Sequence, residues 1–425
     1  MSMMMELLAN IFDRRYLPFE KDKNDNSSII ALVDKLISTA GESSGIALAT
    51  QILDKFEVSS DEDKLTFFNH LSSNMDIDFD VVQKALQNYK EQPSKKTYHD
   101  YMQAVEPRRQ ELIRRLNQVS GATGKLVNMR AELLRLKQQS DTLAALDLDF
   151  RHLFVSWFNR GFLVMRPINW ETPAYILEKI IAYEAVHAID SWGDLRRRMQ
   201  PKDRFCFAFF HLSMPDEPLI FVEVALIRGI PMSVQNILSE EREELSVSCA
   251  DTAVFYSISN CQQGLSGISF GNSLIKQVAA DLSAKFSNLK NFVTLSPIPG
   301  LIKWAKSTDL DTTNEPFSNM KALAAYYLLN VKAPNGKPLD PVARFHLGNG
   351  AKIHAIHNDA DLSEKGVLQS GGAMVNYIYK LDDISANHET FAATGYITAS
   401  QDVNKLSENL TPILRENINV ESTVR

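Results

Sequence analysis

The 425-residue sequence has few cysteines, no long apolar run and no excess of positive charge. Its three cysteines, Cys206, Cys249 and Cys261, are an odd number without a CxxC pair, which indicates a reducing compartment and argues against a structural zinc site. The longest apolar run, residues 219–227, contains Glu223 and is far shorter than the roughly 18 residues of a membrane span. The net charge of −7 argues against a nucleic-acid partner, which usually requires a basic face.

The two ends of the sequence predict neither a secretory signal peptide nor a peroxisomal signal of the Ser-Lys-Leu type. The first 22 residues contain acidic residues and no small-residue cleavage site of the kind that ends a secretory signal. Residues 423–425 do not form a peroxisomal signal of the Ser-Lys-Leu type. We therefore predict a cytoplasmic protein with no membrane partner.

The composition that is present is typical of a globular protein, with 44% apolar and 23% charged residues. At about 150 residues per domain, the length favours two or three domains. A chain of this size buries roughly 75% of its unfolded surface, so it needs neither disulfides nor metal to fold.

The first 150 residues have the apolar spacing of helices and no strand-like alternation. One stripe within residues 28–37 holds Ile29, Ile30, Val33, Leu36 and Ile37. The spacing of Ser59 and Glu62 predicts a capping box at the start of a second helix. Two longer helices are predicted over residues 107–119 and 125–139.

Six arginines of this region could form an anion-binding surface: Arg108, Arg109, Arg114, Arg115, Arg130 and Arg135. Because Glu106, Glu111 and Glu132 are interleaved with them, we predict solvated faces with ion pairs at helical spacing instead. The region holds no cluster of nucleophile, histidine and acid, so it is most economically a packing or oligomerisation module. We predict a helical oligomerisation domain over residues 1–155 and a mixed domain over residues 156–425.

The second half alternates strand-like and helical segments. Residues 204–212 and 219–227 are rich in β-forming residues, and the two prolines and acidic pair between them predict a hairpin turn. Residues 252–259 and 291–296 predict two more strands, and residues 342–347 and 373–379 predict shorter ones. We therefore predict an α+β chain that is all-helical first and mixed α/β afterwards.

A glycine-bearing loop, residues 261–271, joins a predicted strand to a predicted helix over residues 273–286. Gly264, Gly267 and Gly271 allow a tight turn and a close approach by a ligand, and the free N–H groups of the following helix suit a phosphate. The loop is neither a Walker A motif nor a dinucleotide fingerprint. The pattern alone leaves both a phosphate site and an ordinary β–α packing turn open.

Ser296 ends a predicted strand and precedes Pro297. A residue before proline favours an extended backbone, and the carboxyl ends of strands are where α/β proteins commonly bind ligands. The surrounding sequence is not the Gly-x-Ser-x-Gly elbow of a serine hydrolase. Ser296 is a candidate site residue, with an ordinary strand-end serine as the alternative.

His346 follows Val342 and Arg344 at the period-two spacing of a strand and precedes a glycine-containing loop. Such a histidine is a candidate general acid or base near neutral pH, and a hydrogen-bonded core histidine is the alternative. His354 and His357 have a spacing that can bind metal, but no third ligand lies near them, so we predict no metal site.

Six stretches taken together resemble the malonyl-CoA decarboxylase family: residues 149–158, 211–226, 255–267, 295–300, 340–350 and 374–379. The resemblance extends in order over roughly residues 60–380. It implies an N-terminal helical oligomerisation domain followed by a C-terminal domain with the GNAT acyltransferase fold, and a role in fatty acid metabolism.

The resemblance also implies site residues. The family's catalytic pair falls on Ser296 and His346, and Ser257 and Tyr379 are candidates for a supporting shell. The CoA-contacting loop falls on Ser266, Gly267, Ile268, Ser269, Phe270, Gly271 and Asn272. Because Gly264 and Ser269 stand at the first and last positions of the usual acyltransferase loop pattern, backbone N–H groups are expected to make most of the pyrophosphate contacts.

The implied reaction is decarboxylation of malonyl-CoA to acetyl-CoA and CO2 without metal, biotin or pyridoxal, because the thioester carbonyl accepts the released electrons. In this reading Ser296 orients the carboxylate, backbone groups stabilise the enolate and His346 protonates the carbanion. The implied assembly is a homo-oligomer, a dimer or tetramer, formed through the helical domain. Two alternatives are a CoA-dependent acyltransferase and a non-enzymatic acyl-CoA-binding regulator.

Overall fold

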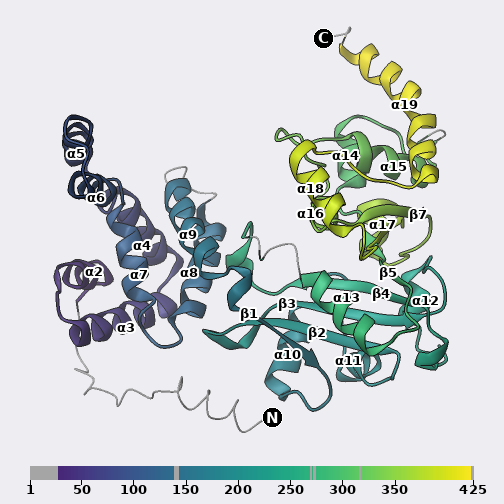
Figure 1. Ribbon diagram of the computed structural model, residues 1–425, viewed down its shortest axis with the longest axis horizontal. Coiled ribbons are helices and arrows are strands. Elements are labelled where there is room, and N and C mark those ends of the chain that lie inside the picture. The colour runs from purple at the N-terminus through teal and green to yellow at the C-terminus, as the bar shows by residue number, and fades with distance from the viewer. Residues whose placement is uncertain (1–26, 138–142, 269, 271–273, 315–316, 423–425) are drawn as a thin grey trace. The chain divides into compact units, whose positions relative to one another are not determined.

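The computed structural model describes residues 27–137, 143–268, 270, 274–314 and 317–422, with side chains up to residue 412. The chain divides into two compact units (Figure 1). Unit 1 comprises Met1–Trp157 and Gln263–Ile268, and unit 2 comprises Phe158–Gln262 and Ser269–Arg425. The division falls close to the predicted boundary at residues 155 and 156, but a short segment of the second half belongs to unit 1.

Unit 1 is helical throughout the part of it that is described. Its α-helices are α2 (Ile29–Ser38), α3 (Glu42–Val58), α4 (Asp61–Asn74), α5 (Phe79–Glu91), α6 (Lys95–Ala104), α7 (Arg108–Leu116), α8 (Ala122–Leu136) and α9 (Ala144–Trp157). The predicted capping box was wrong by one residue: Ser60 caps α4 by accepting the N–H of Asp63 at 3.2 Å, whereas Ser59 ends α3. A short 3-10 turn, η5 (Gln263–Leu265), packs against α8.

Two of the six arginines that were predicted to be solvated are buried. Arg109 pairs with Asp149, and Arg130, only 1% exposed, pairs with Asp147 at 2.9 Å. A buried guanidinium is tolerated only when it is paired and hydrogen-bonded, and here both carboxylates come from α9. The prediction failed because it considered partners within one helix, whereas these partners come from another.

Unit 2 is built on one eight-stranded sheet. Its strands are β1 (Leu163–Ile168), β2 (Arg204–His211), β3 (Met214–Ile227), β4 (Thr252–Asn260), β5 (Asn291–Thr294), β6 (Ser296–Pro297), β7 (Lys352–His357) and β8 (Met374–Ile378). The order is β1-β2-β3-β4-β5-β8-β6, and β7 also pairs with β8. β4 and β5 run parallel, whereas the other paired strands are antiparallel. The predicted α+β class, a helical region followed by a mixed sheet, is confirmed.

Helices cover both faces of this sheet (Figure 1). α10 (Ala174–Tyr183) and α11 (Trp192–Met199) share an apolar cluster with Cys206 of β2. The neighbouring residue, Phe205, points to the opposite face, because side chains alternate along a strand. There it packs on Phe286, which follows α13 (Leu274–Lys285), with ring centroids 5.5 Å apart.

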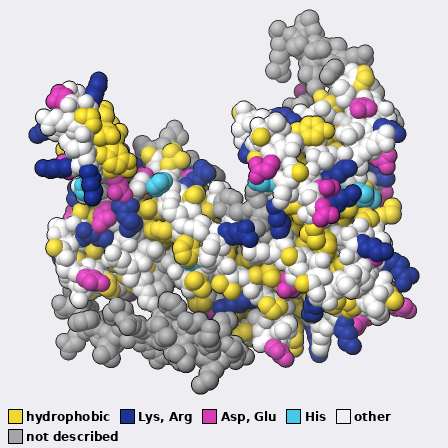
Figure 2. Space-filling view, in the orientation of Figure 1, with side chains coloured by type: hydrophobic (Ala, Val, Ile, Leu, Met, Phe, Trp, Pro, Cys, Tyr) yellow, Lys and Arg dark blue, Asp and Glu magenta, His cyan; other side chains and the backbone are white. Residues whose placement is uncertain are grey.

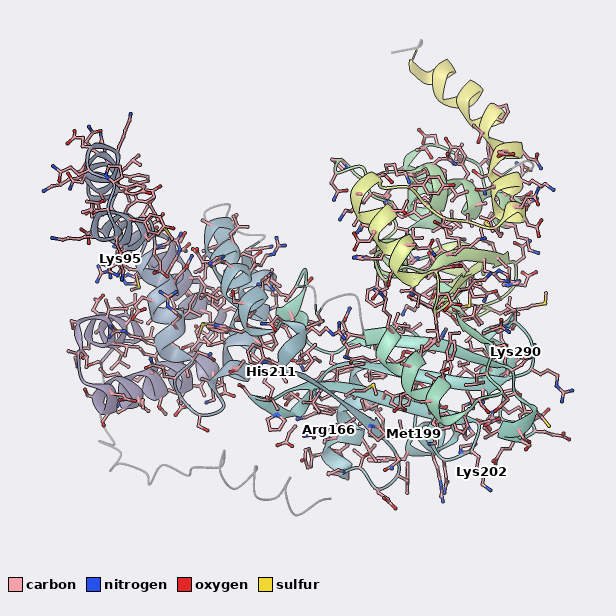
Figure 3. All side chains as sticks on the ribbon, viewed as in Figure 1. Lys95, Arg166, Met199, Lys202, His211 and Lys290 are labelled. Atoms are coloured by element: carbon pink, nitrogen blue, oxygen red, sulfur yellow. The ribbon has the colours of Figure 1, made fainter. Side chains whose placement is uncertain are left out.

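β2 and β3 form the predicted hairpin, but its turn is shorter than expected. β3 begins at Met214, so Pro215 and Pro218 lie inside the strand. The register shifts near the end of β2, and such irregularities tolerate proline, which has no N–H to donate. His211, at the end of β2, and Lys290, just before β5, mark opposite ends of the sheet (Figure 3).

The segment over residues 342–347 was predicted as a strand, and this was wrong. It belongs to α16 (Pro341–Gly348), and His346 therefore lies in the last turn of a helix. Asp340 caps this helix by accepting the N–H of Ala343 at 2.8 Å, and Pro341 occupies its first turn. These helix-start signals outweigh the period-two spacing that predicted a strand.

The remaining α-helices of unit 2 are α12 (Val234–Leu238), α14 (Leu301–Ser307), α15 (Met320–Asn330), α17 (Glu364–Ser370), α18 (Ile384–Thr394) and α19 (Gln401–Ser422). α15 packs along α19 and also contacts β7. Across the described residues, no helix combines the length and the apolar content that crossing a bilayer requires.

Candidate active site

Two buried side chains from different elements of unit 2 meet beside β8. Ser296 begins β6 and is 6% exposed, and His346, in the last turn of α16, is 2% exposed. The His346 Nε2 atom lies 3.1 Å from Ser296 Oγ. The structure thus brings together the two residues that the family resemblance implied as a catalytic pair.

A series of hydrogen bonds determines which nitrogen of His346 carries the proton. Ser296 Oγ donates its one hydrogen to Thr294 Oγ1 at 2.8 Å. The contact between Ser296 and the ring is therefore donated by Nε2–H, and Nδ1 accepts from the Tyr379 hydroxyl at 2.7 Å. The neutral ring holds its proton on Nε2, facing the serine.

Burial determines the protonation states of His346 and Tyr379. It lowers the pKa of His346 to about 3, so the ring is neutral at neutral pH. It also raises the pKa of Tyr379 well above its usual range, so the hydroxyl keeps its proton. Tyr377 of β8 stacks on the His346 ring with centroids 4.5 Å apart and planes inclined by 23°. The site therefore presents a neutral N–H donor in a fixed orientation.

Ser257 takes part in a different contact from the one expected. It lies in β4, and its Oγ donates to the Glu184 carboxylate, 2.7 Å from Oε2. Within the described part of the chain, no hydrogen bond joins Ser257 to Ser296 or His346. Of the two residues suggested as a supporting shell, Tyr379 contacts the histidine directly and Ser257 does not.

The segment implied to contact CoA is described in part. Ser266, Gly267 and Ile268 belong to unit 1, Phe270 is buried, and Ser269, Gly271 and Asn272 lie outside the described residues. A Cβ at Gly264 would lie 1.8 Å from the Val127 carbonyl oxygen, so this glycine is required for packing against α8. Arg130 Nη1 donates to the carbonyl oxygens of Gly264 at 2.7 Å and Ser266 at 3.0 Å. These contacts fix the backbone of the segment.

Two residues of the hydrogen-bonded site were missed by the sequence reasoning. Thr294 lies two positions before Ser296, and Tyr377 lies two positions before Tyr379. Residues two apart in an extended segment share a face, so this signal was present in the sequence. Thr294 lies within the strand predicted over residues 291–296, and Tyr377 lies within the strand predicted over residues 373–379.

Two cationic residues of unit 2, Lys276 and Arg160, were also not predicted from the sequence as site residues. Partial burial, followed by the charge of Arg160, lowers the pKa of Lys276 in the first turn of α13. Arg160 belongs to the turn η3 (Arg160–Phe162). Among the described residues, no carboxylate lies within ion-pair distance of either cation. Unneutralised positive charge near the start of a helix favours an anionic ligand.

His354 and His357, considered above as metal ligands, lie in β7. His357 Nε2 is 2.6 Å from Asn376 Oδ1, within hydrogen-bonding distance. Over the ranges that are described, no group of three or more histidine, cysteine, aspartate or glutamate side chains has the arrangement to hold a metal ion.

Comparison with protein families matches both halves of the chain. Residues 76–158 match the malonyl-CoA decarboxylase N-terminal domain, and residues 161–319 and 307–420 match the malonyl-CoA decarboxylase C-terminal domain. The chain belongs to the malonyl-CoA decarboxylase family. A family member from Anser anser anser, "Malonyl-CoA decarboxylase, mitochondrial", is 34% identical over 355 residues, which are 70% of this chain and 69% of that protein. The protein of the same name from Rattus norvegicus is 33% identical over 353 residues, 71% of each chain.

Solved structures of the malonyl-CoA decarboxylase family agree with this fold. The protein from Rhodopseudomonas palustris is similar at a TM-score of 0.85 and 46% identity, covering 89% of this chain and 98% of that chain. The protein from Agrobacterium vitis is similar at a TM-score of 0.82 and 45% identity, covering 90% of this chain and 100% of that chain. The family resemblance drawn from six sequence stretches is confirmed, and the chain is an enzyme of the lyase class.

Proposed function

We propose that this chain decarboxylates malonyl-CoA to acetyl-CoA and CO2 with its own groups, without a metal or an organic cofactor. The observation that carries the proposal is the buried series from Ser296 through His346 to Tyr379, which presents a neutral Nε2–H. Loss of CO2 from a β-carboxy thioester leaves an enolate, because the thioester carbonyl accepts the electrons of the broken bond. The protein then has to supply a positioned proton donor and stabilise the enolate oxygen.

Each residue of the series has one role in this scheme. When substrate binds, the Ser296 hydroxyl turns from Thr294 Oγ1 and donates its one hydrogen to the malonyl carboxylate, which holds the breaking C–C bond in line with the π system of the thioester. The bond breaks heterolytically, CO2 leaves, and the two electrons form the enolate, for which one backbone N–H donor contributes about 3–4 kcal/mol. The α-carbon then takes the Nε2 proton of His346, a step worth roughly 10²–10⁴-fold for a positioned acid. The ring is left as an imidazolate, which accepts the hydrogen bond of Tyr379 at Nδ1 until it regains a proton from solvent.

A neutral ring suits this sequence of steps better than an imidazolium. A cationic ring would form an ion pair with the substrate carboxylate and so stabilise the ground state, which does not accelerate the reaction. The neutral Nε2–H makes a weaker bond to the substrate, whereas the enolate is basic enough to take its proton. The Tyr379 hydroxyl, 2.7 Å from Nδ1, stabilises the ring while its Nε2 proton is absent.

The CoA part of the substrate is assigned to residues 266–272, as the family resemblance implied. The hydrogen bond from Arg130 Nη1 to the Ser266 carbonyl oxygen, which fixes the backbone at the start of this segment, supports the assignment. A phosphate there would be bound mainly by backbone N–H groups, as the departure from the usual loop pattern implied.

The test is an assay of the purified chain with malonyl-CoA, a chelator and no acyl acceptor. The proposal predicts acetyl-CoA and CO2 in equal amounts. A product formed only when an amine acceptor is added would indicate a CoA-dependent acyltransferase instead. CoA binding with neither product would indicate a non-enzymatic acyl-CoA-binding regulator.

A homo-oligomer, a dimer or tetramer formed through unit 1, is part of the same proposal. α5 and α6 contact each other and contain no buried side chain. Together they expose Phe79 (74%), Val81, Leu86, Tyr98 and Met102, and hydrophobic side chains gather over these helices in Figure 2. Contiguous exposed apolar surface of this kind marks an interaction site.

Sedimentation of a Leu86→Asp variant tests this surface. The variant should dissociate to a smaller species, because a buried unpaired carboxylate disfavours an apolar interface. Val58→Asp is the matched control, since Val58 is an exposed apolar residue of α3, outside the α5–α6 pair. An unchanged mass for Leu86→Asp would overturn the assignment.

The cytoplasm remains the proposed compartment. Cys206 and Cys261 are buried and Cys249 is exposed, and all three are free thiols, as in a reducing environment. The names of the curated relatives contain the word mitochondrial. Fractionation of cells that produce the tagged chain distinguishes the two compartments.

A further inference from the structure

Thr294, the last residue of β5, accepts two hydrogen bonds beside the Ser296–His346 pair. Its Oγ1 accepts the Ser296 Oγ hydrogen at 2.8 Å and the Tyr377 N–H at 3.2 Å. A hydroxyl oxygen has two lone pairs, so both are in use. Thr294 is 0% exposed, and bulk water therefore does not compete for this oxygen.

The backbone of Thr294 is held in place as well. Its carbonyl oxygen accepts a hydrogen bond from Asn376 Nδ2 at 2.8 Å, and Asn376 is itself 0% exposed. Asn376 and Tyr377 are consecutive residues of β8. Two neighbouring residues of one strand thus bind the carbonyl and the hydroxyl of Thr294. The oxygen that accepts from Ser296 is fixed before any substrate binds.

The hydrogen of the Ser296 hydroxyl has two places to go. Among the described residues, the hydrogen-bond partners of Ser296 Oγ are Thr294 Oγ1 and His346 Nε2. While Thr294 takes the hydrogen, Nε2 must donate to Ser296, and Nδ1 accepts from Tyr379. If the hydrogen turned to Nε2 instead, the ring proton would move to Nδ1, and the Tyr379 hydrogen would lose its acceptor. The tautomer protonated on Nε2 is therefore the one that makes all three bonds.

We infer that Thr294 is a positioning residue, which keeps the His346 proton on Nε2 by accepting the Ser296 hydrogen. This role rests on the proposed function, because a proton on Nε2 matters to the reaction only if the substrate enolate takes it. Nε2 faces Ser296, where the malonyl carboxylate is assigned, whereas Nδ1 faces Tyr379. When Ser296 turns to the carboxylate, the ring already holds its proton on the nitrogen that faces the substrate.

The test compares Thr294→Val, which keeps the shape of the side chain and removes the acceptor, with Thr294→Ser, which keeps the hydroxyl. Nitrogen NMR of isotope-labelled histidine reports the tautomer, because protonated and unprotonated ring nitrogens differ in shift, and Nε2 couples to both carbon-bound ring hydrogens. A spectrum of His346→Gln identifies the His346 signals by their loss.

The wild-type ring should hold its proton on Nε2 in roughly 90% or more of the molecules, since one hydrogen bond gives about a tenfold preference. In Thr294→Val each tautomer leaves one hydroxyl hydrogen unpaired, so the two forms should be about equally populated. Thr294→Ser should restore the wild-type preference.

Steady-state kinetics give a second readout. In Thr294→Val, kcat/KM for malonyl-CoA should fall about twofold, in proportion to the fraction of molecules in the active tautomer. The value of kcat should change less, because in the substrate complex Ser296 donates to the carboxylate. Thr252→Val is the matched control: it removes a buried threonine hydroxyl of β4 whose partners are Asp251 and Asn291. It should change neither the tautomer nor kcat/KM.

A wild-type ring with its proton on Nδ1 would overturn the inference, whether or not the variant folds. An Nε2 proton retained in Thr294→Val, no recovery in Thr294→Ser, or the same shift in Thr252→Val would also overturn it. The tautomer is measured without substrate, so the two proposals fail separately. If the wild-type chain releases no CO2 but the proton moves in Thr294→Val, the proposed function fails and the role of Thr294 in setting the tautomer stands. If CO2 is released and the proton does not move, the reverse holds.

Discussion

Replacing Tyr379 by phenylalanine removes the hydroxyl that donates to His346 and leaves the ring volume intact. Tyr379 is buried, and its ring packs against Phe255 with centroids 6.4 Å apart. Phenylalanine keeps that contact. The variant therefore deletes one hydrogen bond of 2.7 Å and little else.

The size of the expected loss in kcat follows from the state of His346 Nδ1, which has no hydrogen-bond donor in the variant. A buried acceptor left without its donor costs about 1–3 kcal/mol. Because the hydroxyl supports the ring while the Nε2 proton leaves, this cost falls on the transition state, and kcat should drop about 10- to 100-fold. KM should change little, because Tyr379 and Ser296 bind opposite nitrogens of the ring.

The assay measures kcat and KM for acetyl-CoA formation by Tyr379→Phe and by the control Tyr377→Phe. Tyr377 stacks on the same ring, but its hydroxyl has no hydrogen-bond partner among the described residues, so its loss should cost much less. Both variants should unfold cooperatively, which thermal denaturation checks. Equal kcat values for the two variants, or a Tyr379→Phe defect confined to KM, would refute the reasoning.

Three further outcomes are expected. Ser296→Ala should lower kcat/KM for malonyl-CoA because the carboxylate loses its orienting hydroxyl, whereas unchanged turnover would contradict that role. The pKa of His346 is about 3 in the folded chain and 6.5 in the unfolded chain. Between these two pH values the unfolded chain therefore binds a proton at this histidine that the folded chain does not bind. As the pH is lowered from 6.5 to 5, the free energy of unfolding, measured by urea denaturation, should therefore decrease by about 2 kcal/mol more in the wild type than in His346→Gln. Gly264→Ala, whose Cβ would lie 1.8 Å from the Val127 oxygen, should destabilise the fold by at least about 1–3 kcal/mol and raise KM.

The architecture could be predicted from the sequence where local patterns and packing agree. The helices of the first half and the β2–β3 hairpin followed from apolar spacing and turn residues. The helix that carries His346 was missed because period-two spacing was given more weight than the capping signal of Asp340 and Pro341. A cap hydrogen bond and a proline in the first turn stabilise a helix start directly, whereas polar and apolar alternation over six residues is weak support for a strand.

The contacts between distant segments could not be predicted from patterns along the chain. Arg130 was assigned to a solvated face, but Asp147 and the carbonyl oxygens of Gly264 and Ser266 surround it. The partner in α9 and the two carbonyl groups 134 and 136 positions away become visible only in the fold. For the same reason the pairing of Ser296 with His346 was an implication of the family resemblance, not of spacing.

The central claim is that His346 delivers the proton that completes decarboxylation. Acetyl-CoA formation by His346→Ala, measured beside the wild type together with the Kd of CoA, tests it most directly. We predict that turnover falls by roughly 10²–10⁴-fold while the Kd of CoA stays within about twofold. Turnover within about threefold of the wild type, at unchanged CoA affinity, would contradict the claim, because the proton would then come from another group.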